Sequence, residues 1–503
     1  MSSALNSHSI QDVTGLPVYA NSVTPFDGGT LFLARTPSGR RLGILAPRES
    51  ACHSRFAGDV TERGEQLLGV CPLTHANALA LREALSWLQP RLLGMQTSAG
   101  CGDRLGLATP GHVRAARQVQ EHFREPVLGM IFAQQSIREM GRTARTPDEV
   151  LDDATWGTFQ EGWRAGVGAD ADHLKTLADL ERCAAVGYSF FTIDPGDHVD
   201  SLADDAEGQA LLAGFDALPW AELEITPTDL RLRYANLRLD LDDRVLSVDS
   251  LELARAAVKY GRALAHTVRM YRRLLNIKGA GAFELEASVD ETDTPTSPAE
   301  HVFIASELKR LGVRWVSLAP RYVGRFEKAV DYIGDLQALD RDLAAHAAIA
   351  RALGPYKLSL HSGSDKFTVY PILARHARGL LHLKTAGTSY LEALRVLASF
   401  DPDLFREILA LAIERFEADR ASYHFSARLE KVPPPDALAD AELPNLLEQF
   451  DARQVLHMTY GSVLTSERGF RTRLLEGLAA HEEDYYAALQ RHFVRHLQPL
   501  IEV

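Results

Sequence analysis

The sequence predicts an α/β protein, a (β/α)8 TIM barrel, and two observations support this fold class. Eight short apolar runs follow one another between residues 92 and 389, and each leads into a polar or glycine-containing loop. Amphipathic helical patterns separate most of these runs. Strands that alternate with helices are typical of parallel sheets with right-handed crossovers, and eight such units form a closed barrel. A doubly wound open sheet is the main alternative.

The predicted strands, with the loops that follow them, are LLGMQTSAGCGDR, PVLGMIFAQQS, GVGADADHLK, YSFFTIDPGDHV, AFELEASVDET, RWVSLAPRYVG, YKLSLHSGSDK and LLHLKTAGTS. Two of the helices between them carry clear end signals. One begins with Thr109 as N-cap and Pro110 at the first helical position. The other begins with Ser297 and Pro298 and ends at Gly312.

Two extensions flank the barrel, which is predicted over residues 91–400. Residues 1–90 are predicted as a β-rich N-terminal extension, because TLFLARTPSGRRLGILAP has two alternating runs around the turn T-P-S-G. An acidic insertion at residues 200–250 is expected to cover one end of the barrel or to mediate contacts in a homo-oligomer. Residues 401–503 are predicted as a mainly helical C-terminal extension, with KVPPPDALADAELP as a linker within it.

Composition limits the function classes. The chain has 503 residues, 46% of them apolar, and a formal net charge of −13. An acidic chain is a poor partner for nucleic acid or an anionic membrane, so neither is expected. The four cysteines form no C-x-x-C pair, which argues against a structural zinc site or a disulfide framework. The N-terminal segment has no apolar signal region, and no run approaches the roughly 18 apolar residues of a membrane span. The expectation is a cytoplasmic protein.

Polar side chains gather at the predicted strand ends, which is where (β/α)8 barrels carry their functional groups. In strand order they are Asp103 and Arg104; Gln134 and Gln135; Asp170, Asp172, His173 and Lys175; Asp194, Asp197 and His198; Glu284, Glu286, Asp290 and Glu291; Arg321; His361, Ser362, Asp365 and Lys366; His382, Lys384, Thr385 and Thr388. Buried charges are costly unless they are paired or bound to a metal. The pattern therefore predicts a charged small-molecule site at one mouth of the barrel.

Histidines close to carboxylates indicate a divalent metal. His361 lies between a strand and the loop S-G-S-D-K, and His382 shares a strand face with Lys384. His173 follows two aspartates, of which Asp172 could instead be a helix N-cap. Imidazole combined with carboxylate suits Zn, Mn, Fe, Co or Ni.

Carboxylates and one arginine suggest contacts with a substrate. Glu284 and Glu286 alternate in FELEA, and Glu286 is the one nearer the barrel mouth. Arg321 in LAPRYVG suits an anionic group or a structural ion pair. The loops SGSDK and KTAGTS could hold an anion through backbone N–H groups, but neither has the phosphate-binding P-loop spacing. GCGDRLG lacks the spacing of a dinucleotide-binding motif.

Taken together, GDRLGLATPGH, GADADHLK, FTIDPGDHV, FELEASVDET, LHSGSDKF and LHLKTAGTSYLEALR resemble the tagaturonate epimerase family, with HMTYGSVLT extending the likeness towards the C-terminus. The resemblance implies interconversion of D-tagaturonate and D-fructuronate with a divalent metal, in hexuronate catabolism.

This resemblance leads to a set of expected roles. His173, His361 and His382 are expected to bind the metal, and Asp172 and Glu286 to act as catalytic acid and base. The expected substrate contacts are Asp103, Arg104, Arg321, Ser362, Asp365, Lys366, Lys384 and Thr388.

The two sugar acids differ at C4 in ketose numbering, which simple enolisation of the ketone does not reach. Retro-aldol cleavage of the C3–C4 bond, transient oxidation and direct proton removal at C4 remain as routes, and the missing dinucleotide motif disfavours oxidation. A metal-dependent sugar-acid aldolase or ketose isomerase is the alternative function, followed by a non-catalytic sugar-acid sensor.

Overall fold

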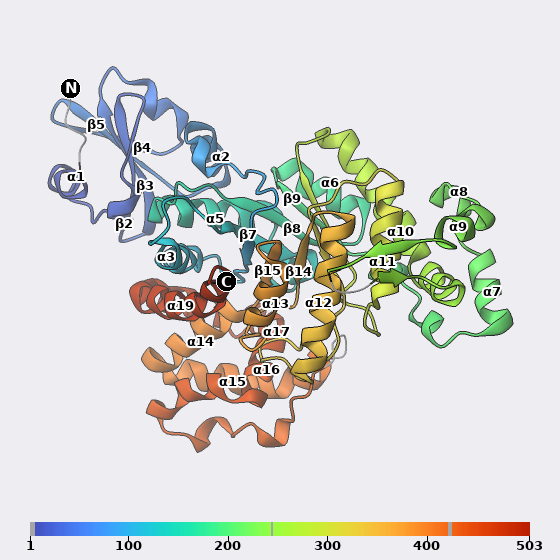
Figure 1. Cartoon of the computed structure of the whole chain (residues 1–503). Coiled ribbons are helices and arrows are strands. Elements are labelled where there is room, and N and C mark those ends of the chain that lie inside the picture. Colours follow the sequence, from blue (N-terminus) through green and yellow to red (C-terminus); the bar gives the residue numbers. More distant parts are fainter. Residues whose placement is uncertain (1–5, 243–244, 421–424, 503) are drawn as a thin grey trace.

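The computed structural model describes residues 6–242, 245–420 and 425–502. Within them, eight parallel strands close into a barrel in the order β12-β13-β14-β15-β6-β7-β8-β9 (Figure 1). The barrel strands are β6 (Ser98–Cys101), β7 (Gly129–Ser136), β8 (Gly168–Leu174), β9 (Phe190–Ile193), β12 (Glu284–Ser288), β13 (Ser317–Ala319), β14 (Lys357–Leu360) and β15 (Leu381–Thr385). Each predicted run contains one of these strands, so the predicted (β/α)8 barrel is confirmed.

The barrel strands are buried on both faces, with apolar residues packed against the helices and polar residues facing the barrel interior. Leu358 and Leu360 of β14 belong to the large hydrophobic core between the barrel and its helices. Lys357 and Ser359 of the same strand are equally buried, so the barrel interior is polar. Ser359 is in register with His382 of β15, and this pairing fixes the height of both side chains in the barrel.

Helices cover the outside of the barrel. They are α3 (Thr109–Gln120), α4 (Ile137–Thr143), α5 (Pro147–Glu161), α6 (Leu177–Val186), α10 (Ser250–Lys278), α11 (Pro298–Arg310), α12 (Leu336–Leu353), α13 (Tyr370–Ala377) and α14 (Thr388–Phe400). The N-cap Ser297 of α11 forms the predicted start, and its side chain accepts from the backbone N–H of Glu300. The predicted N-cap Thr109 is wrong by one residue, because α3 already includes Thr109 and its N-cap is Ala108.

The N-terminal region contains a five-stranded antiparallel sheet in the order β1-β2-β3-β5-β4. Its strands are β1 (Thr24–Phe26), β2 (Gly29–Thr36), β3 (Gly39–Pro47), β4 (Asp59–Arg63) and β5 (Gln66–Cys71), flanked by α1 (Ser7–Thr14) and α2 (His75–Ala84). The predicted hairpin is β2–β3. Leu31 and Leu33 of this sheet share a hydrophobic cluster with Trp156 and Phe159 of α5, which attaches the sheet to the barrel.

The acidic insertion packs beside α10, away from the N-terminal sheet (Figure 1). Its elements are α7 (Gly208–Asp216), α8 (Trp220–Leu223), α9 (Pro227–Tyr234), β10 (Arg238–Asp240) and β11 (Val245–Ser247). The neighbouring α10 begins at a capping box formed by Asp249 and Glu252.

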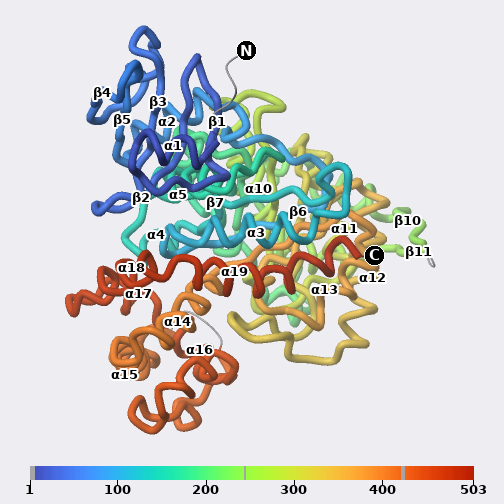
Figure 2. Tube along the Cα trace, turned by 90° about the vertical axis from the view of Figure 1, so that its left-hand side faces the viewer, coloured from blue at the N-terminus to red at the C-terminus, as the bar shows by residue number. Residues whose placement is uncertain are grey.

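The C-terminal region is helical, with α15 (Pro402–Asp419), α16 (Phe450–Met458), α17 (Tyr460–Leu464), α18 (Phe470–Ala480) and α19 (Glu482–Leu497). Helix α19 runs alongside α3 (Figure 2). The stretch predicted as a linker instead forms short 3-10 turns that pack on α14 and α15, and its Leu443 is fully buried. Among the described residues, every helix is too short or too polar to cross a membrane.

Candidate active site at the barrel mouth

Lys384 of β15 is the centre of a buried charge cluster. Its Nζ lies 2.7 Å from Asp170 Oδ2, 2.8 Å from Asp172 Oδ1 and 3.2 Å from Glu286 Oε1. It also donates a hydrogen bond to the hydroxyl of Thr192. The three carboxylates come from β8 and β12, and alternation along these strands points them all into the barrel. The cluster therefore holds three acidic groups around one ammonium, away from water.

The charges in this cluster stabilise one another. Burial lowers the pKa of Lys384, but the three carboxylates outweigh burial and raise that pKa above its ordinary value. Burial raises the pKa of Asp172 and of Glu286, but Lys384 and His361 hold both pKa values well below their ordinary range. Burial dominates at Asp170 and raises its pKa to about 6. Asp172 and Glu286 are thus ionised at neutral pH.

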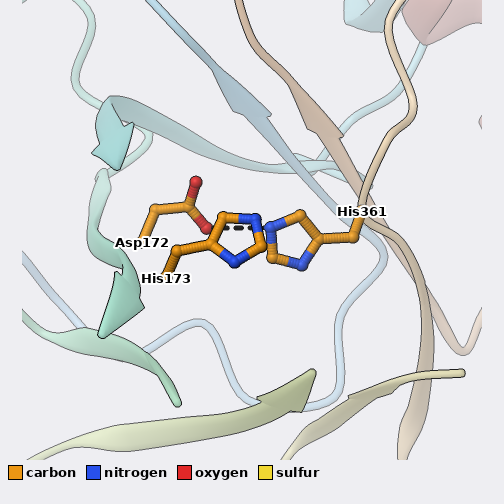
Figure 3. Close-up of side chains that lie close together, drawn as sticks. All are labelled: Asp172, His173 and His361. Carbon is orange, nitrogen blue, oxygen red and sulfur yellow. Dashed lines mark ion pairs between the residues drawn. The ribbon is translucent and has the colours of Figure 1, made fainter. Parts of the chain in front are cut away.

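His361 follows β14 and lies against this cluster. Its Nε2 is 3.1 Å from Asp172 Oδ1, and its Nδ1 is 3.3 Å from Glu286 Oε1. The imidazole of His173, on β8, lies 4.1 Å from that of His361 between ring centroids (Figure 3). His173 has a left-handed backbone with φ of 51°, and its Nδ1 is 3.1 Å from Asp194 Oδ2. The N-cap alternative for Asp172 is wrong, because β8 continues past it to Leu174.

Asp172, His173 and His361 fit a divalent metal. One donor atom from each residue lies within 4.8 Å of the others. His361 Nε2 lies 3.1 Å from Asp172 Oδ1. Burial lowers the pKa of His361, but the surrounding carboxylates outweigh burial and raise that pKa to about 10, so a metal ion would bind here by displacing a proton. Two imidazoles and a carboxylate are a donor set that transition metals accept. Asp194 and Glu291 flank His173 and could orient it or contribute a further oxygen.

The structure does not bring His382 into this group. Its register partner Ser359 is two residues before His361, so His382 lies deeper in the barrel. Its Nδ1 is hydrogen-bonded to Ser98 Oγ at 2.8 Å, and burial lowers its pKa to about 3. The metal role of His382 stays a prediction that this geometry does not favour.

Asp365 and Thr388, both predicted substrate contacts, belong to a second buried network. Asp365 Oδ1 is 2.9 Å from His492 Nε2, and its Oδ2 is 3.1 Å from Arg453 Nη2. Thr388 Oγ1 lies 2.6 Å from the same His492 nitrogen. His496 Nε2 already accepts the backbone N–H of Asp365, which leaves no lone pair there for a metal. This network ties α19 and α16 to the loop that carries His361.

Lys366 and Asp103, two further predicted substrate contacts, use their side chains to bond backbone groups of the protein. Lys366 donates to the carbonyls of Glu327, Val330 and Ser364 at 2.7, 2.6 and 2.9 Å. Asp103 accepts three backbone N–H groups of its own loop, at residues 105, 106 and 108. Their predicted role in binding is therefore indirect in this geometry, through the loops that they order.

Two pockets lie at the barrel mouth and share Lys328, His361 and Phe425. Of the charge cluster, only Asp172 lines either pocket, and Lys384, Asp170 and Glu286 lie beneath it. The inner pocket is lined by Arg104, Gln134, Ser136, Arg138, Glu139, Asp172, His173, Lys328, His361, Ala386, Phe425, His457, Met458 and Tyr460. The outer pocket, of about 590 Å³, is lined by Arg321 and Ser362 together with residues of the loops after β12 and β13. Three of the predicted contacts, Arg104, Arg321 and Ser362, therefore border the pockets. No residue of the 200–250 insertion lines either pocket within the described chain.

Sequence reasoning missed the part of the pocket wall that lies far along the chain. His457 and Tyr460 come from the C-terminal helices, and the guanidinium of Arg104 stacks 3.5 Å from the Tyr460 ring centroid. The motif HMTYGSVLT, which contains both residues, was the available signal. Lys328 also borders the site, in the long loop between β13 and α12, and no motif marked it.

These features define a (β/α)8-barrel enzyme with a buried acid–base cluster and a donor set for a divalent metal at its mouth. The sequence model of the tagaturonate epimerase family, UxaE, matches residues 19–500. The chain belongs to this family and is an isomerase-class enzyme.

Characterised relatives agree over the whole length. The tagaturonate/fructuronate epimerase of Thermotoga maritima is 41% identical over 487 residues, which are 97% of each chain. The native crystal structure of fructuronate-tagaturonate epimerase UxaE from Cohnella laeviribosi superposes with a TM-score of 0.90 at 34% identity, covering 98% of this chain and 99% of that one. A glycerol complex of the same enzyme gives the same TM-score and identity, with 98% of each chain covered.

Proposed function

We propose that this protein interconverts D-tagaturonate and D-fructuronate by inverting C4, as a step of hexuronate catabolism. The observation that carries the proposal is the buried cluster of Lys384, Asp172, Glu286 and His361 at the mouth of a barrel whose full-length relatives are epimerases of these two sugar acids. The charged pocket suits a small polyhydroxy anion. Inversion of an unactivated carbinol carbon needs a base, an acid and stabilised negative charge on oxygen, and this cluster offers groups for each task.

A divalent metal is part of the proposal, held by Asp172, His173 and His361. When bound, it would supply Lewis-acid stabilisation of negative charge on the substrate oxygens. This assignment moves Asp172 from the predicted acid–base pair to the ligand set. Its carboxylate is held ionised by Lys384 and His361, so it has no proton to donate at neutral pH. Glu286 keeps its predicted role as base.

The chain's own residues account for the proton movements of a retro-aldol route. Glu286 accepts the proton of the C4 hydroxyl while the C3–C4 bond breaks, which leaves an aldehyde at C4 of the C4–C6 fragment and an enediolate across C2 and C3 of the C1–C3 fragment. The aldehyde rotates to present its other face, C3 attacks it, and the proton returns to the oxygen on C4. Lys384 remains protonated beside Glu286 and is positioned to stabilise the transient negative charge.

Epimerisation is expected to depend on metal. Protein reconstituted with Zn, Mn, Fe, Co or Ni is expected to convert D-fructuronate to D-tagaturonate, and EDTA is expected to abolish the conversion until metal is restored. Product formation is followed by chromatography or NMR. Accumulation of a three-carbon aldehyde in place of tagaturonate would identify an aldolase, and binding without any conversion would identify a sensor.

The metal site makes a separate prediction about two histidines. The His361→Ala variant is expected to lose bound metal, because it removes one of three clustered donors. The His382→Ala variant is expected to retain metal, because His382 lies outside that group. Metal content per protein, measured by elemental analysis, checks both variants. Equal loss in the two variants would return His382 to the ligand set, and full retention in His361→Ala would remove the proposed centre.

A further inference from the structure

Lys328 is placed where a substrate carboxylate would need a partner. It lies in the loop between β13 and α12, and its side chain is half-buried. It lines both pockets, together with His361 and Phe425, whereas each arginine that the described chain places at the mouth lines one pocket. Its Nζ donates to Ser362 Oγ at 2.9 Å. This leaves two of the three ammonium hydrogens for other acceptors.

Lys328 makes no direct carboxylate contact within the described chain, although its charge, together with that of His173, outweighs burial and lowers the pKa of Glu291. No ion pair within 4 Å joins its Nζ to a carboxylate of the described chain. The other cations of the inner pocket differ in this respect. Arg104 lies 2.5 Å from Glu139, and Arg138 lies 2.9 Å from Glu291. A half-buried ammonium without a direct carboxylate partner favours binding of an anion, because its desolvation is only partly compensated.

The chemistry of the substrate selects between Lys328 and Arg321. Arg321 donates to the Asp290 carbonyl and, among the described residues, also makes no ion pair with a carboxylate. In a hexuronate, the carboxylate C6 is only two bonds from C4, where inversion occurs. The carboxylate must therefore bind close to the proposed metal ligands, in the pocket that reaches them. Lys328 borders the inner pocket with Asp172 and His361, whereas Arg321 borders only the outer one.

We infer that Lys328 binds the carboxylate of the sugar acid and makes the enzyme prefer hexuronates to neutral ketohexoses. This inference rests on the proposed function for the identity of the substrate. Arg321, predicted to bind the carboxylate, would then contact the anion only in the outer pocket, as the anion enters.

The test compares Lys328→Met with Lys328→Arg, and Lys309→Met serves as a control because Lys309 is exposed on α11, remote from the pockets. Binding of D-fructuronate and of D-fructose is measured by calorimetry in a Glu286→Gln background, where turnover does not interfere. Loss of a charge-assisted hydrogen bond in Lys328→Met is expected to weaken D-fructuronate binding by about 10- to 100-fold. Lys328→Arg and Lys309→Met are expected to stay within about threefold of the parent, and the preference for D-fructuronate over D-fructose is expected to shrink only in Lys328→Met.

Two results would overturn the inference: unchanged D-fructuronate affinity in Lys328→Met, or an equal loss in Lys328→Arg, which would indicate a packing role. The Michaelis constant of the same lysine variants with intact Glu286 provides a second measurement, expected to rise with little change in kcat. The outcome is separable from that of the proposed function. Tight, Lys328-dependent binding without any epimerisation by the wild type would reject the function alone, and epimerisation with no effect of Lys328 would reject this inference alone.

Discussion

Replacement of Lys384 by methionine is expected to remove activity and to destabilise the fold. Lys384 is 1% exposed and contacts three carboxylates that are themselves buried. Without the ammonium, Asp170, Asp172 and Glu286 would repel one another in a site of low polarity. Breaking a buried ion pair by removing one partner typically costs about 3–5 kcal/mol. The free energy of unfolding from denaturant titration, and kcat with D-fructuronate, measure the two effects.

The pH dependence of stability should change sign in this variant. In the wild type, the pKa values of Asp172 and Glu286 are lower in the folded state than in the unfolded one, so these groups stabilise the protein above pH 4–5 and lose that effect as the pH falls. In Lys384→Met their folded pKa values should rise above the unfolded ones. The variant is then expected to recover stability relative to the wild type as pH falls from about 8 to 5. Measurements in EDTA keep metal binding out of the comparison.

Lys357 provides a matched control, because it is another buried lysine on the inner face of the barrel. It donates to Ser98 Oγ at 3.0 Å and makes no ion pair within 4 Å among the described residues. Burial lowers its pKa to about 8. Lys357→Met should therefore cost less stability than Lys384→Met and should show no reversal with pH. Equal losses in both variants would mean that the volume of the side chain, and not its charge, maintains the site.

The central cluster was predictable because its geometry follows from local rules. Alternation along a strand decides which side chains face the barrel interior, and all strands of a parallel barrel present their carboxyl ends at one mouth. Lys384, Asp172, Glu286 and His361 could therefore be placed together from the sequence alone. The fold class was predictable for the same reason, since each strand–helix unit has its own local pattern.

Depth in the barrel was not predictable. His382 and His361 both lie at the end of a strand motif, but the register between β14 and β15 places His382 beside Ser359. Register is set by packing across the whole sheet, which one strand does not encode.

The side-chain directions in the loop after β14, and the contacts of that loop with distant helices, were also not predictable from the sequence. Asp365 and Lys366 follow His361 closely, but Asp365 has a left-handed backbone, with φ of 61°, and both side chains turn into the protein. Asp365 pairs with His492 and Arg453 from the C-terminal helices. Such contacts depend on where distant elements dock, and a sequence motif cannot specify that.

Replacement of Glu286 by glutamine is expected to abolish most turnover while leaving fold and metal intact. Glu286 is fully buried, and its Oε2 accepts from Ser317 Oγ at 2.6 Å. A glutamine has the same shape, can present its amide oxygen to Lys384, and can donate from its amide N–H to Ser317 Oγ, which reverses that hydrogen bond. It cannot accept a proton, so loss of general-base catalysis should lower kcat by about 100- to 10,000-fold. Steady-state kinetics, thermal unfolding and metal content measure the three properties.

Glu284 is the control for this experiment, because it lies on the same face of β12 as Glu286 and two residues deeper in the barrel. Its carboxylate accepts the backbone N–H groups of Leu93 and Gly94, so it serves to hold a loop and is remote from Lys384. Glu284→Gln should therefore keep kcat within about threefold of the wild type, although its melting temperature should fall as a charge-assisted contact weakens. A wild-type kcat in Glu286→Gln would exclude Glu286 as the base. Asp170, whose burial raises its pKa to about 6, would then be the carboxylate in the cluster best suited to exchange a proton near neutral pH.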